Sequence, residues 1–486
     1  MTEIQTSSAA DRRARLSLRL LAAEDARRVY AAALERLAGP GIVPGGEEAR
    51  AALLAAGATP VAGSPAAGVA PALALRPDLV EAAAAQAPKQ VVLGGRDADG
   101  DVVLTPGAAL LGAGGRPAPL VEPVAGGPPR DVVLDDVGEA CRLADALPDV
   151  AVVVGPPVSP PGDEGTQVLA LDAAVRATSK HVQVAGVASP RVAATAAQMA
   201  AALRGDASAV RRRPPLSLVG GATSFAAAAV FAGAGLPVGA LVAAPEASGA
   251  VVGPATSPAA LTEAVVSFVA DVLAANAAVQ ALAPGAAFVA PVWPAAAGLP
   301  AAGPDATTFI VAVTQVLTDA GLPVAAHVFA TSAGEPDWLA CTDGAFAALS
   351  AAAAGVALLT GAGTLRGGEV FSPRELVADA EIHSWCTAVA AGIPVDDETL
   401  AVEAIKDVGI GGNFLGQKHT RRHMKDVWRP RLLDRSPWDA WVAEGRLSAA
   451  DRAAELALTL LAQHEVAPID EERAATLERI IASAGL

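Results

Sequence analysis

Cationic and imidazole side chains gather in one stretch of the chain, residues 411–435. His419 and His423 are four residues apart, so on a helix they share a face and have a spacing found in metal sites. No third ligand lies nearby in the sequence, and we predict no metal site. The stretch also carries Arg421, Arg422 and Lys425. Such a surface can meet an anionic cofactor or an acidic partner protein, although a solvated helix face with internal ion pairs explains it equally well.

Composition narrows the class of protein. The 486 residues suffice for one large domain with extensions or for two to three smaller ones. The formal net charge of -16 argues against a general nucleic-acid binder. Three scattered cysteines are too few for a disulfide framework, so we expect a reducing cytoplasm.

The sequence predicts neither a signal peptide nor a membrane span. The N-terminal residues lack the apolar core of a signal peptide. One long uncharged run, residues 225–244, is broken by three glycines and a proline. A helix, a turn and a buried strand explain this run better than a membrane span does.

The elements that must position any site follow two patterns. Residues 9–57 have helical spacing of leucines between charges, which predicts one or two amphipathic helices on the outside of the main body. Residues 58–130 are rich in Gly and Pro, with short β-like runs at 91–93 and 102–104. We interpret this part as a small, irregular N-terminal subdomain.

From about residue 131, short apolar runs alternate with helical stretches. The runs are 151–154, 182–187, 216–219, 238–242, 287–292, 324–329 and 356–359. Helices are expected at 137–146, 189–203, 262–282, 307–320 and 344–354, and after the last run at 373–391, 397–408, 449–464 and 471–484. This rhythm predicts a parallel sheet with both faces covered, and eight units would close a barrel. Residues 369–371 are a candidate eighth strand.

We therefore predict an α/β fold, a TIM (β/α)8 barrel with an N-terminal helical and β extension and C-terminal helices. The expected parts are 1–130 for the extension, 131–395 for the barrel and 396–486 for the C-terminal helices packed on it. A doubly wound open sheet is the alternative, but no G-x-G-x-x-G follows an early strand.

Several long stretches resemble the trimethylamine methyltransferase family, whose branch without pyrrolysine includes glycine betaine methyltransferases. The similarity covers roughly residues 75–480. It is carried by GPATSPAAL (253–261), GVALLTGAGTL (355–365), ELVADAEI (375–382), GIPVDDETLAVEAIKDVGIGGNFLGQKHT (392–420) and WRPRLLDR (428–435).

The resemblance implies a TIM barrel that moves a methyl group from a methylated amine to the cobalt of a corrinoid (cobalamin) on a separate corrinoid protein. The chain has only standard residues, so quaternary amines such as glycine betaine are expected before trimethylamine. Asp271 and Asp343 stand where the family leads us to expect Glu, Glu335 where we expect Lys, and Leu339 where we expect Gln. We also expect a homo-oligomer.

Methyl transfer from a quaternary nitrogen needs a site that binds a cation, aligns the N–CH3 bond and excludes water. Aromatic faces and carboxylates at the C-terminal ends of barrel strands would do this. Catalytic candidates are Asp337, Asp343 and His327. Substrate-binding candidates are Glu246, Thr256, Phe288, Trp293, Phe329 and Trp338.

Most of these candidates also have a structural interpretation. Phe288 and Phe329 lie in apolar strands, which favours the core. Asp337 and Asp343 are typical helix caps. The expected corrinoid contacts are Gly361, Gly363, Gly411, Gly412, His419 and Thr420. Two other functions stay open, a barrel that binds a methylated amine or a partner protein without turnover, and a barrel lyase.

Overall fold

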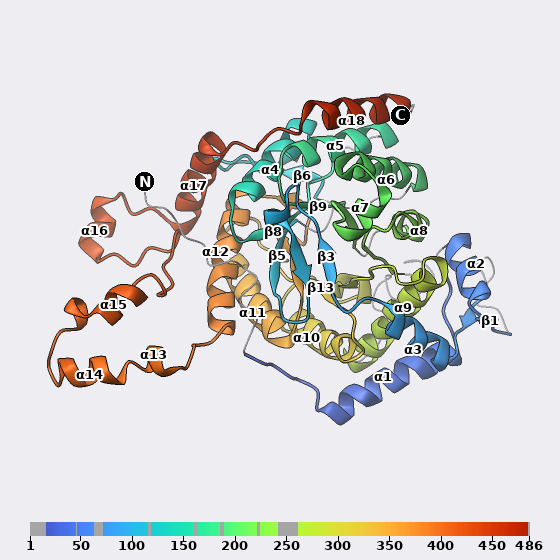
Figure 1. Cartoon of the computed structure of the whole chain (residues 1–486), viewed down its shortest axis with the longest axis horizontal. Helices are drawn as coiled ribbons and strands as arrows, with labels where there is room; N and C mark the ends of the chain where they lie inside the picture. Colours follow the sequence, from blue (N-terminus) through green and yellow to red (C-terminus); the bar gives the residue numbers. More distant parts are fainter. Residues whose placement is uncertain are drawn as a thin grey trace.

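The computed structural model describes residues 16–44, 46–62, 71–114, 118–159, 163–184, 189–220, 224–241 and 261–484. Eight parallel strands form its central sheet (Figure 1). They are β5 (Leu110–Ala113), β8 (Val150–Val153), β9 (His181–Gln183), β10 (Leu216–Val219), β11 (Val238–Gly239), β12 (Ala290–Val292), β13 (Val324–His327) and β14 (Leu358–Ala362).

The sheet closes into a barrel. Neighbouring strands follow the order of the chain from β5 to β11, and β14 pairs with β5. Between β11 and β12 the ladder continues through a parallel bridge from Val238 to Phe288, where the Val289 N–H donates to the Val238 carbonyl at 2.8 Å. The predicted TIM barrel is thereby confirmed.

A helix follows each barrel strand and covers the barrel from outside (Figure 1). These are α4 (Leu134–Ala146), α5 (Glu164–Arg176), α6 (Pro190–Arg204), α8 (Phe225–Ala234), α9 (Leu261–Leu282), α10 (Pro304–Asp319), α11 (Trp338–Ala354) and α12 (Pro373–Ala390). A short α7 (Ala207–Arg212) follows α6, and a 3-10 turn, η3 (Pro294–Ala297), precedes α10.

The seven expected strands are confirmed, but the expected eighth is wrong. Residues 370–371 form β16 (Val370–Phe371) in a small side sheet with β15 (Thr364–Leu365), β6 (Leu120–Val121) and β7 (Arg130–Asp131). The missing barrel strand is β5, which lies before residue 131. β5 has four residues including a glycine, so its apolar run is short. The division of the chain into three parts stays a prediction.

The N-terminal part closes and covers the barrel. The hairpin of β3 (Val91–Leu93) and β4 (Val102–Leu104) packs Val91, Leu93 and Leu104 against inward-facing strand residues such as Leu110. Because Leu110 begins its strand, the hairpin closes the N-terminal end of the barrel. The turn η2 (Ala98–Gly100) joins the two strands of the hairpin.

The N-terminal helices cover the helix α9. It is apolar on all sides, and it packs against α1 (Ala23–Ala38), α2 (Glu47–Ala55) and α3 (Pro77–Gln86) as well as α10. Within the described part, α9 is the one helix long and apolar enough to cross a membrane, and 78% of its apolar window is buried in the fold. Its composition is that of a core helix. A two-stranded sheet, β1 (Thr59–Pro60) with β2 (Leu73–Ala74), lies beside these helices.

After α12 the chain leaves the barrel and returns. It forms α13 (Asp397–Leu400), α14 (Val402–Val408), η4 (Phe414–Gly416) and α15 (Lys418–His423), then α16 (Trp438–Ala443), α17 (Ala449–Gln463) and α18 (Glu471–Ser483). The single helix expected over residues 397–408 is wrong, because Ala401 at φ 49° separates α13 from α14. Figure 1 shows α13 to α15 projecting away from the barrel.

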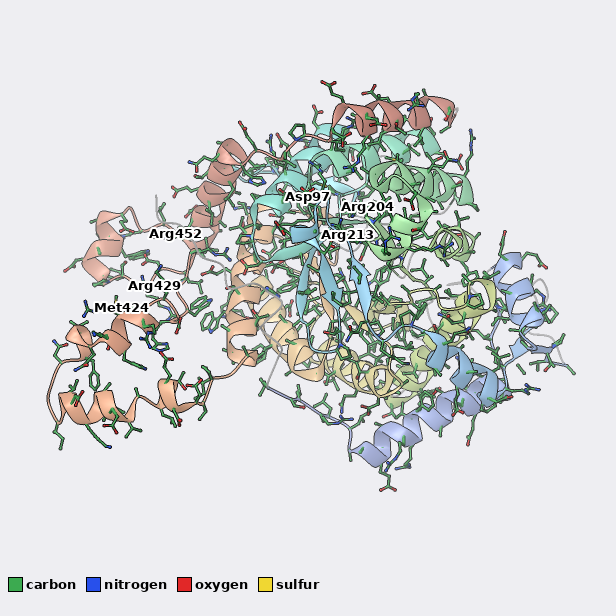
Figure 2. All side chains as sticks on the ribbon, viewed as in Figure 1. Asp97, Arg204, Arg213, Met424, Arg429 and Arg452 are labelled. Carbon is green, nitrogen blue, oxygen red and sulfur yellow. The ribbon has the colours of Figure 1, made fainter. Side chains whose placement is uncertain are left out.

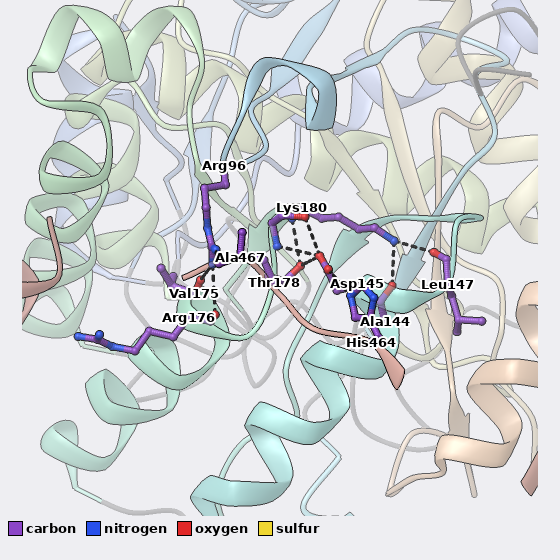
Figure 3. Close-up of polar contacts among 11 residues, drawn as sticks. Arg96, Ala144, Asp145, Leu147, Val175, Arg176, Thr178, Lys180, His464 and Ala467 are labelled. Atoms are coloured by element: carbon purple, nitrogen blue, oxygen red, sulfur yellow. Dashed lines mark hydrogen bonds and ion pairs between the residues drawn. The ribbon is translucent and has the colours of Figure 1, made fainter. Parts of the chain in front are cut away.

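The last helices are held to the barrel by a polar network (Figure 3). Asp145 accepts hydrogen bonds from the Thr178 hydroxyl at 2.6 Å and pairs with His464 at 2.7 Å. Lys180 donates to the Ala144 and Leu147 carbonyls at 2.9 and 2.6 Å, and burial lowers the pKa of Lys180 to about 8. Because the donors and acceptors of this network meet one another, we assign it a structural role.

Candidate active site

A hollow opens at the C-terminal ends of the barrel strands, where TIM barrels carry their sites. It measures about 330 Å³ including the part open to solvent. Its lining comes from β9, β10, β12, β13 and β14, namely Gln183, Val219, Gly220, Pro291, Val292, Trp293, Ala325, His327 and Thr360. The lining is mostly apolar with a few polar groups, as small-molecule sites are.

Two predicted residues meet in this hollow. Trp293 follows β12 and His327 ends β13, and the pairing of Val292 with Ala326 makes them near neighbours. Their rings lie 6.1 Å apart, edge to face at 68°. His327 is buried and Trp293 half-buried. An indole face beside an open hollow is suited to a cationic methylated nitrogen.

Gln183 is a lining residue that sequence reasoning missed. Its side-chain nitrogen donates to the Val219 carbonyl at 2.9 Å, and this bond fixes the amide against the wall of the barrel. The side-chain oxygen is buried, without a hydrogen-bond partner among the described residues. A buried acceptor of this kind usually meets a ligand or water. A signal existed, since Gln183 is the one amide in the apolar run at 182–187.

Gly361 allows the backbone of β14 to approach His327. Its φ is 103°, and a Cβ there would lie 2.5 Å from the Phe329 carbonyl oxygen and 2.8 Å from His327 Cε1. Gly363 has φ 84°, and its N–H donates to Asp379 at 2.8 Å. Both glycines are buried, in conformations that L side chains rarely adopt, and neither belongs to the lining of the hollow.

The two predicted phenylalanines lie elsewhere. Side chains from residue 288 to the end of β12 alternate between the inside and the outside of the barrel. Phe288 faces outward and is fully buried in the layer between strands and helices. Phe329 packs in the same layer against α11, where a Cβ on Gly344 would meet its ring at 3.3 Å. Neither residue lines the hollow, so both fit the structural interpretation given above.

The predicted acids and Trp338 lie in and after the loop that follows β13, outside the lining of the hollow. Asp337 caps α11 by accepting from the N–H groups of Leu339 and Ala340 at 2.8 and 3.1 Å. Trp338 is 80% exposed. Asp343 accepts from the Thr331 hydroxyl at 2.8 Å, and burial raises the pKa of its carboxyl. Their assigned roles stay predictions.

A buried carboxyl pair stands behind β14. Glu375 and Asp379 are one turn apart on α12, and each is 2% exposed. Burial raises the pKa of Asp379 to about 7 and raises that of Glu375 well above its usual range. The proximity of the two carboxyls raises the pKa of Glu375 further. At neutral pH the pair therefore retains a proton, which keeps a hydrogen bond between the two side chains.

The remaining predicted residues are not brought together with the hollow. Gly411, Gly412, His419 and Thr420 lie on the projecting segment, where His419 bonds to the Glu398 carbonyl at 2.8 Å. Glu246 and Thr256 lie outside the described residues. In the part of the chain that the structure describes, no group of three His, Cys, Asp or Glu side chains is placed to hold a metal ion.

A second cavity lies at the other end of β9 and β10, lined among others by Arg96, Lys180, Arg204 and Arg473. Its basic groups are already used. Arg204 donates to the carbonyls of Arg213, Arg96 and Gly95, and burial lowers its pKa to about 10. Arg96 donates to the carbonyls of residues 175, 176, 178 and 467 (Figure 3). The hollow at the opposite end is the candidate active site.

A TIM barrel with a small apolar and aromatic hollow at its C-terminal end defines the class of the protein. A family model described as trimethylamine methyltransferase (MTTB) matches residues 3–484. The chain is 30% identical to the trimethylamine methyltransferase MttB of Desulfitobacterium hafniense over 424 residues, which cover 83% of this chain and 82% of that protein.

Two other relatives are also methyltransferases that act on methylated amines by name. Identity is 26% to the glycine betaine methyltransferase of Desulfitobacterium hafniense over 424 residues, 84% of this chain and 86% of the relative. It is 36% over 182 residues to the trimethylamine methyltransferase of Methanosarcina barkeri, 37% of each chain. The chain belongs to the trimethylamine methyltransferase family, and it is an enzyme, a methyltransferase.

Proposed function

We propose that this enzyme moves a methyl group from a methylated amine to Co(I) of a corrinoid carried by a separate protein. Quaternary amines such as betaines are the first donors to test. The observation that carries the proposal is the hollow itself, which the Trp293 indole, the His327 ring and Gln183 line together. The side-chain oxygen of Gln183 has no hydrogen-bond partner among the described residues. The names of the relatives support the same class of donor.

The chemistry needs little from the protein beyond binding and alignment. The N–CH3 bond breaks, its electron pair stays on nitrogen as a neutral amine, and the methyl group leaves as a cation equivalent. Co(I) supplies the electron pair that captures it when the corrinoid protein is bound. A protein base or nucleophile is not required, and the described lining of the hollow offers no carboxylate or thiol. The lining residues therefore suit this reaction better than lyase chemistry.

Each lining residue has a role in the proposal. The face of Trp293 holds the cationic nitrogen, whose charge falls as the methyl group departs. Gln183 accepts a hydrogen bond or orients a polar end of the donor, and His327 closes the wall beside it. Gly361 allows the close approach of His327, and Gly361 and Gly363 stay proposed contacts of the corrinoid. Glu246 and Thr256 stay candidates for the missing negative charge, and the three free cysteines agree with the proposed cytoplasmic location.

The test is a methyl-transfer assay with the purified full-length chain. The chain is mixed with reduced cobalamin or a corrinoid protein and with glycine betaine, choline, carnitine or trimethylamine, and methylation of the corrinoid is followed by absorbance. We expect one quaternary amine to be demethylated, with a weaker reaction in Trp293→Leu and an unchanged one in Trp438→Leu, since Trp438 is 67% exposed on α16. Binding of a donor without any methylation, beside a working control enzyme, would instead favour a barrel that binds amines without turnover.

A further inference from the structure

The second cavity lies at the N-terminal end of the barrel, away from the hollow, and we call it the N-terminal cavity. It measures about 730 Å³ including the part open to solvent. Its walls come from parts of the chain that are far apart in the sequence: the turn after β3 (residues 94–97), the ends of α5 and α6, and the segment 467–473 that leads into α18. A ligand that fills such a cavity touches all of these parts and stabilises the arrangement in which they meet.

Three guanidinium groups line the N-terminal cavity, each from a different element. Arg96 follows β3, Arg204 ends α6, and Arg473 lies in the first turn of α18. Figure 2 shows Asp97 and Arg204 close to Arg213, whose carbonyl accepts a hydrogen bond from Arg204 at 2.7 Å. A guanidinium presents a planar fork of N–H donors that matches the oxygens of an anion. Three of them around one cavity therefore form a set of donors suited to an anionic ligand.

The hydrogen bonds of Arg96 and Arg204 fix these side chains without neutralising them. Their acceptors are backbone carbonyls, which carry no net charge. Arg204 makes three such bonds, and a guanidinium has five N–H donors, so two of its donors stay available to a ligand. Lys180 contributes less, since its ammonium is directed to the carbonyls of Ala144 and Leu147 (Figure 3). Two cations are thus held in place at the wall with their charge uncompensated by these bonds.

Positive charge is in excess around the N-terminal cavity. Apart from Lys180, three arginines face two aspartates, Asp97 and Asp470, which leaves a net charge of +1 in a chain of -16. Asp470 is already engaged with Arg473, because its carboxylate accepts from the Arg473 N–H at 3.0 Å and pairs with the Arg473 guanidinium at 3.3 Å. Asp97 is exposed, and its side chain makes no helix-capping hydrogen bond.

The surroundings of Arg204 would stabilise a bound anion. Burial lowers the pKa of Arg204 to about 10. Repulsion by the neighbouring cations Arg213 and Arg473 also lowers this pKa, and attraction by Asp101 and Asp97 offsets only part of that effect. An anion that lies against Arg204 reduces the repulsion and accepts hydrogen bonds from the available donors, which are stronger when the donor is charged.

We propose that the N-terminal cavity binds a small molecule through a phosphate group, with Arg96, Arg204 and Arg473 as its contacts. Three guanidinium groups suit a phosphate better than a single carboxylate, because the phosphate offers more oxygens and more negative charge. The apolar side chains of Val175 and Leu203 also line the cavity and can meet the rest of the molecule. The inference does not depend on the proposed reaction, since the hollow lies at the opposite end of the barrel.

The test is a titration of the purified full-length chain with inorganic phosphate at constant ionic strength, followed by calorimetry and by the melting temperature. Acetate and chloride at the same ionic strength are the controls for a carboxylate and for charge screening. We expect saturable phosphate binding and a rise in the melting temperature that exceeds the rise in either control. Phosphate binding that does not saturate, or acetate that raises the melting temperature as much as phosphate does, would overturn the proposal.

Three variants locate the bound phosphate, and circular dichroism verifies that each is folded. Arg473→Gln should weaken phosphate binding about three- to tenfold, because it removes one cation from the cavity. Arg479→Gln, at an exposed arginine on the same helix outside the cavity, is the matched control and should leave the affinity unchanged. Asp97→Asn should tighten phosphate binding by a similar factor, because it removes a negative charge from the wall.

Opposite changes in affinity distinguish a binding site from a structural cluster. If the arginines only held the fold together, Arg473→Gln and Asp97→Asn would not shift phosphate affinity in opposite directions. Equal affinities in Arg473→Gln and Arg479→Gln, or an Asp97→Asn variant that binds phosphate no more tightly than the wild type, would overturn the proposal.

Discussion

The buried carboxyl pair behind β14 makes the stability of this enzyme depend on pH in a predictable direction. Asp379 is 2% exposed, and burial raises its pKa from an ordinary value of 3.8 to about 7. In the folded chain the carboxyl stays protonated up to about neutral pH, while in the unfolded chain it ionises above about pH 4. The free energy of unfolding must therefore fall as pH rises between these two values and then level off.

The size of the effect follows from the pKa. A change in pKa from 3.8 to about 7 corresponds to about 4 kcal/mol of stability lost above neutral pH, at about 1.4 kcal/mol for each tenfold change. About 2 kcal/mol of that loss falls between pH 5.5 and pH 8. Asp379→Asn keeps an oxygen that accepts the Gly363 N–H and carries no charge at any pH. This variant should lose about 2 kcal/mol less than the wild type over the same interval.

The assay is denaturant unfolding at pH 5.5 and pH 8 at one fixed protein concentration, followed by circular dichroism. Glu478→Gln is the control, because its side chain is 71% exposed and its removal should leave the wild-type pH dependence in place. Parallel pH dependences for the wild type and Asp379→Asn would refute the reasoning, since they would mean that the pair carries no titration between these pH values.

Three further outcomes test the candidate site. Trp293→Leu should weaken binding of a quaternary amine about 5- to 30-fold, the equivalent of about 1–2 kcal/mol of cation–π attraction, as measured by calorimetric titration; an unchanged affinity would remove Trp293 from the site. Gln183→Leu should raise KM about fivefold through loss of one acceptor, and steady-state kinetics with an unchanged KM would contradict its role. Gly361→Ala should lower the melting temperature, because the new Cβ would lie 2.5 Å from the Phe329 carbonyl oxygen and the backbone has a positive φ. The control Gly138→Ala should not lower it, because the space around Gly138 is open.

Much of the barrel could be predicted from the sequence because a strand covered on both faces is a continuous apolar run. The barrel strand β5 could not be recognised in this way, because its four residues include Gly112 and its apolar run is therefore short. It also follows an irregular hairpin. Trp293 and His327 could be chosen from their positions at strand ends. Whether Phe288 points inward or outward depends on the register of one strand, which composition does not reveal.

The projecting segment, residues 392–427, shows another limit of sequence reasoning. The basic stretch at 411–435 is visible as a charge pattern, but whether its cations are free depends on partners such as Glu398, which precedes Arg422 by 24 residues. The large apolar side chains of this segment are exposed, which only the structure shows. Packing partners far apart in the chain determine both properties.

The central claim is that a methylated amine sits in the hollow against the face of Trp293. The most direct measurement is the NMR spectrum of a ¹³C-methyl-labelled betaine titrated with the full-length chain. Ring currents of the indole should displace the N-methyl resonance upfield, and the displacement should vanish in Trp293→Leu while it persists in Trp438→Leu. An N-methyl resonance that stays in place at saturating protein, or one displaced equally in Trp293→Leu, would contradict the account.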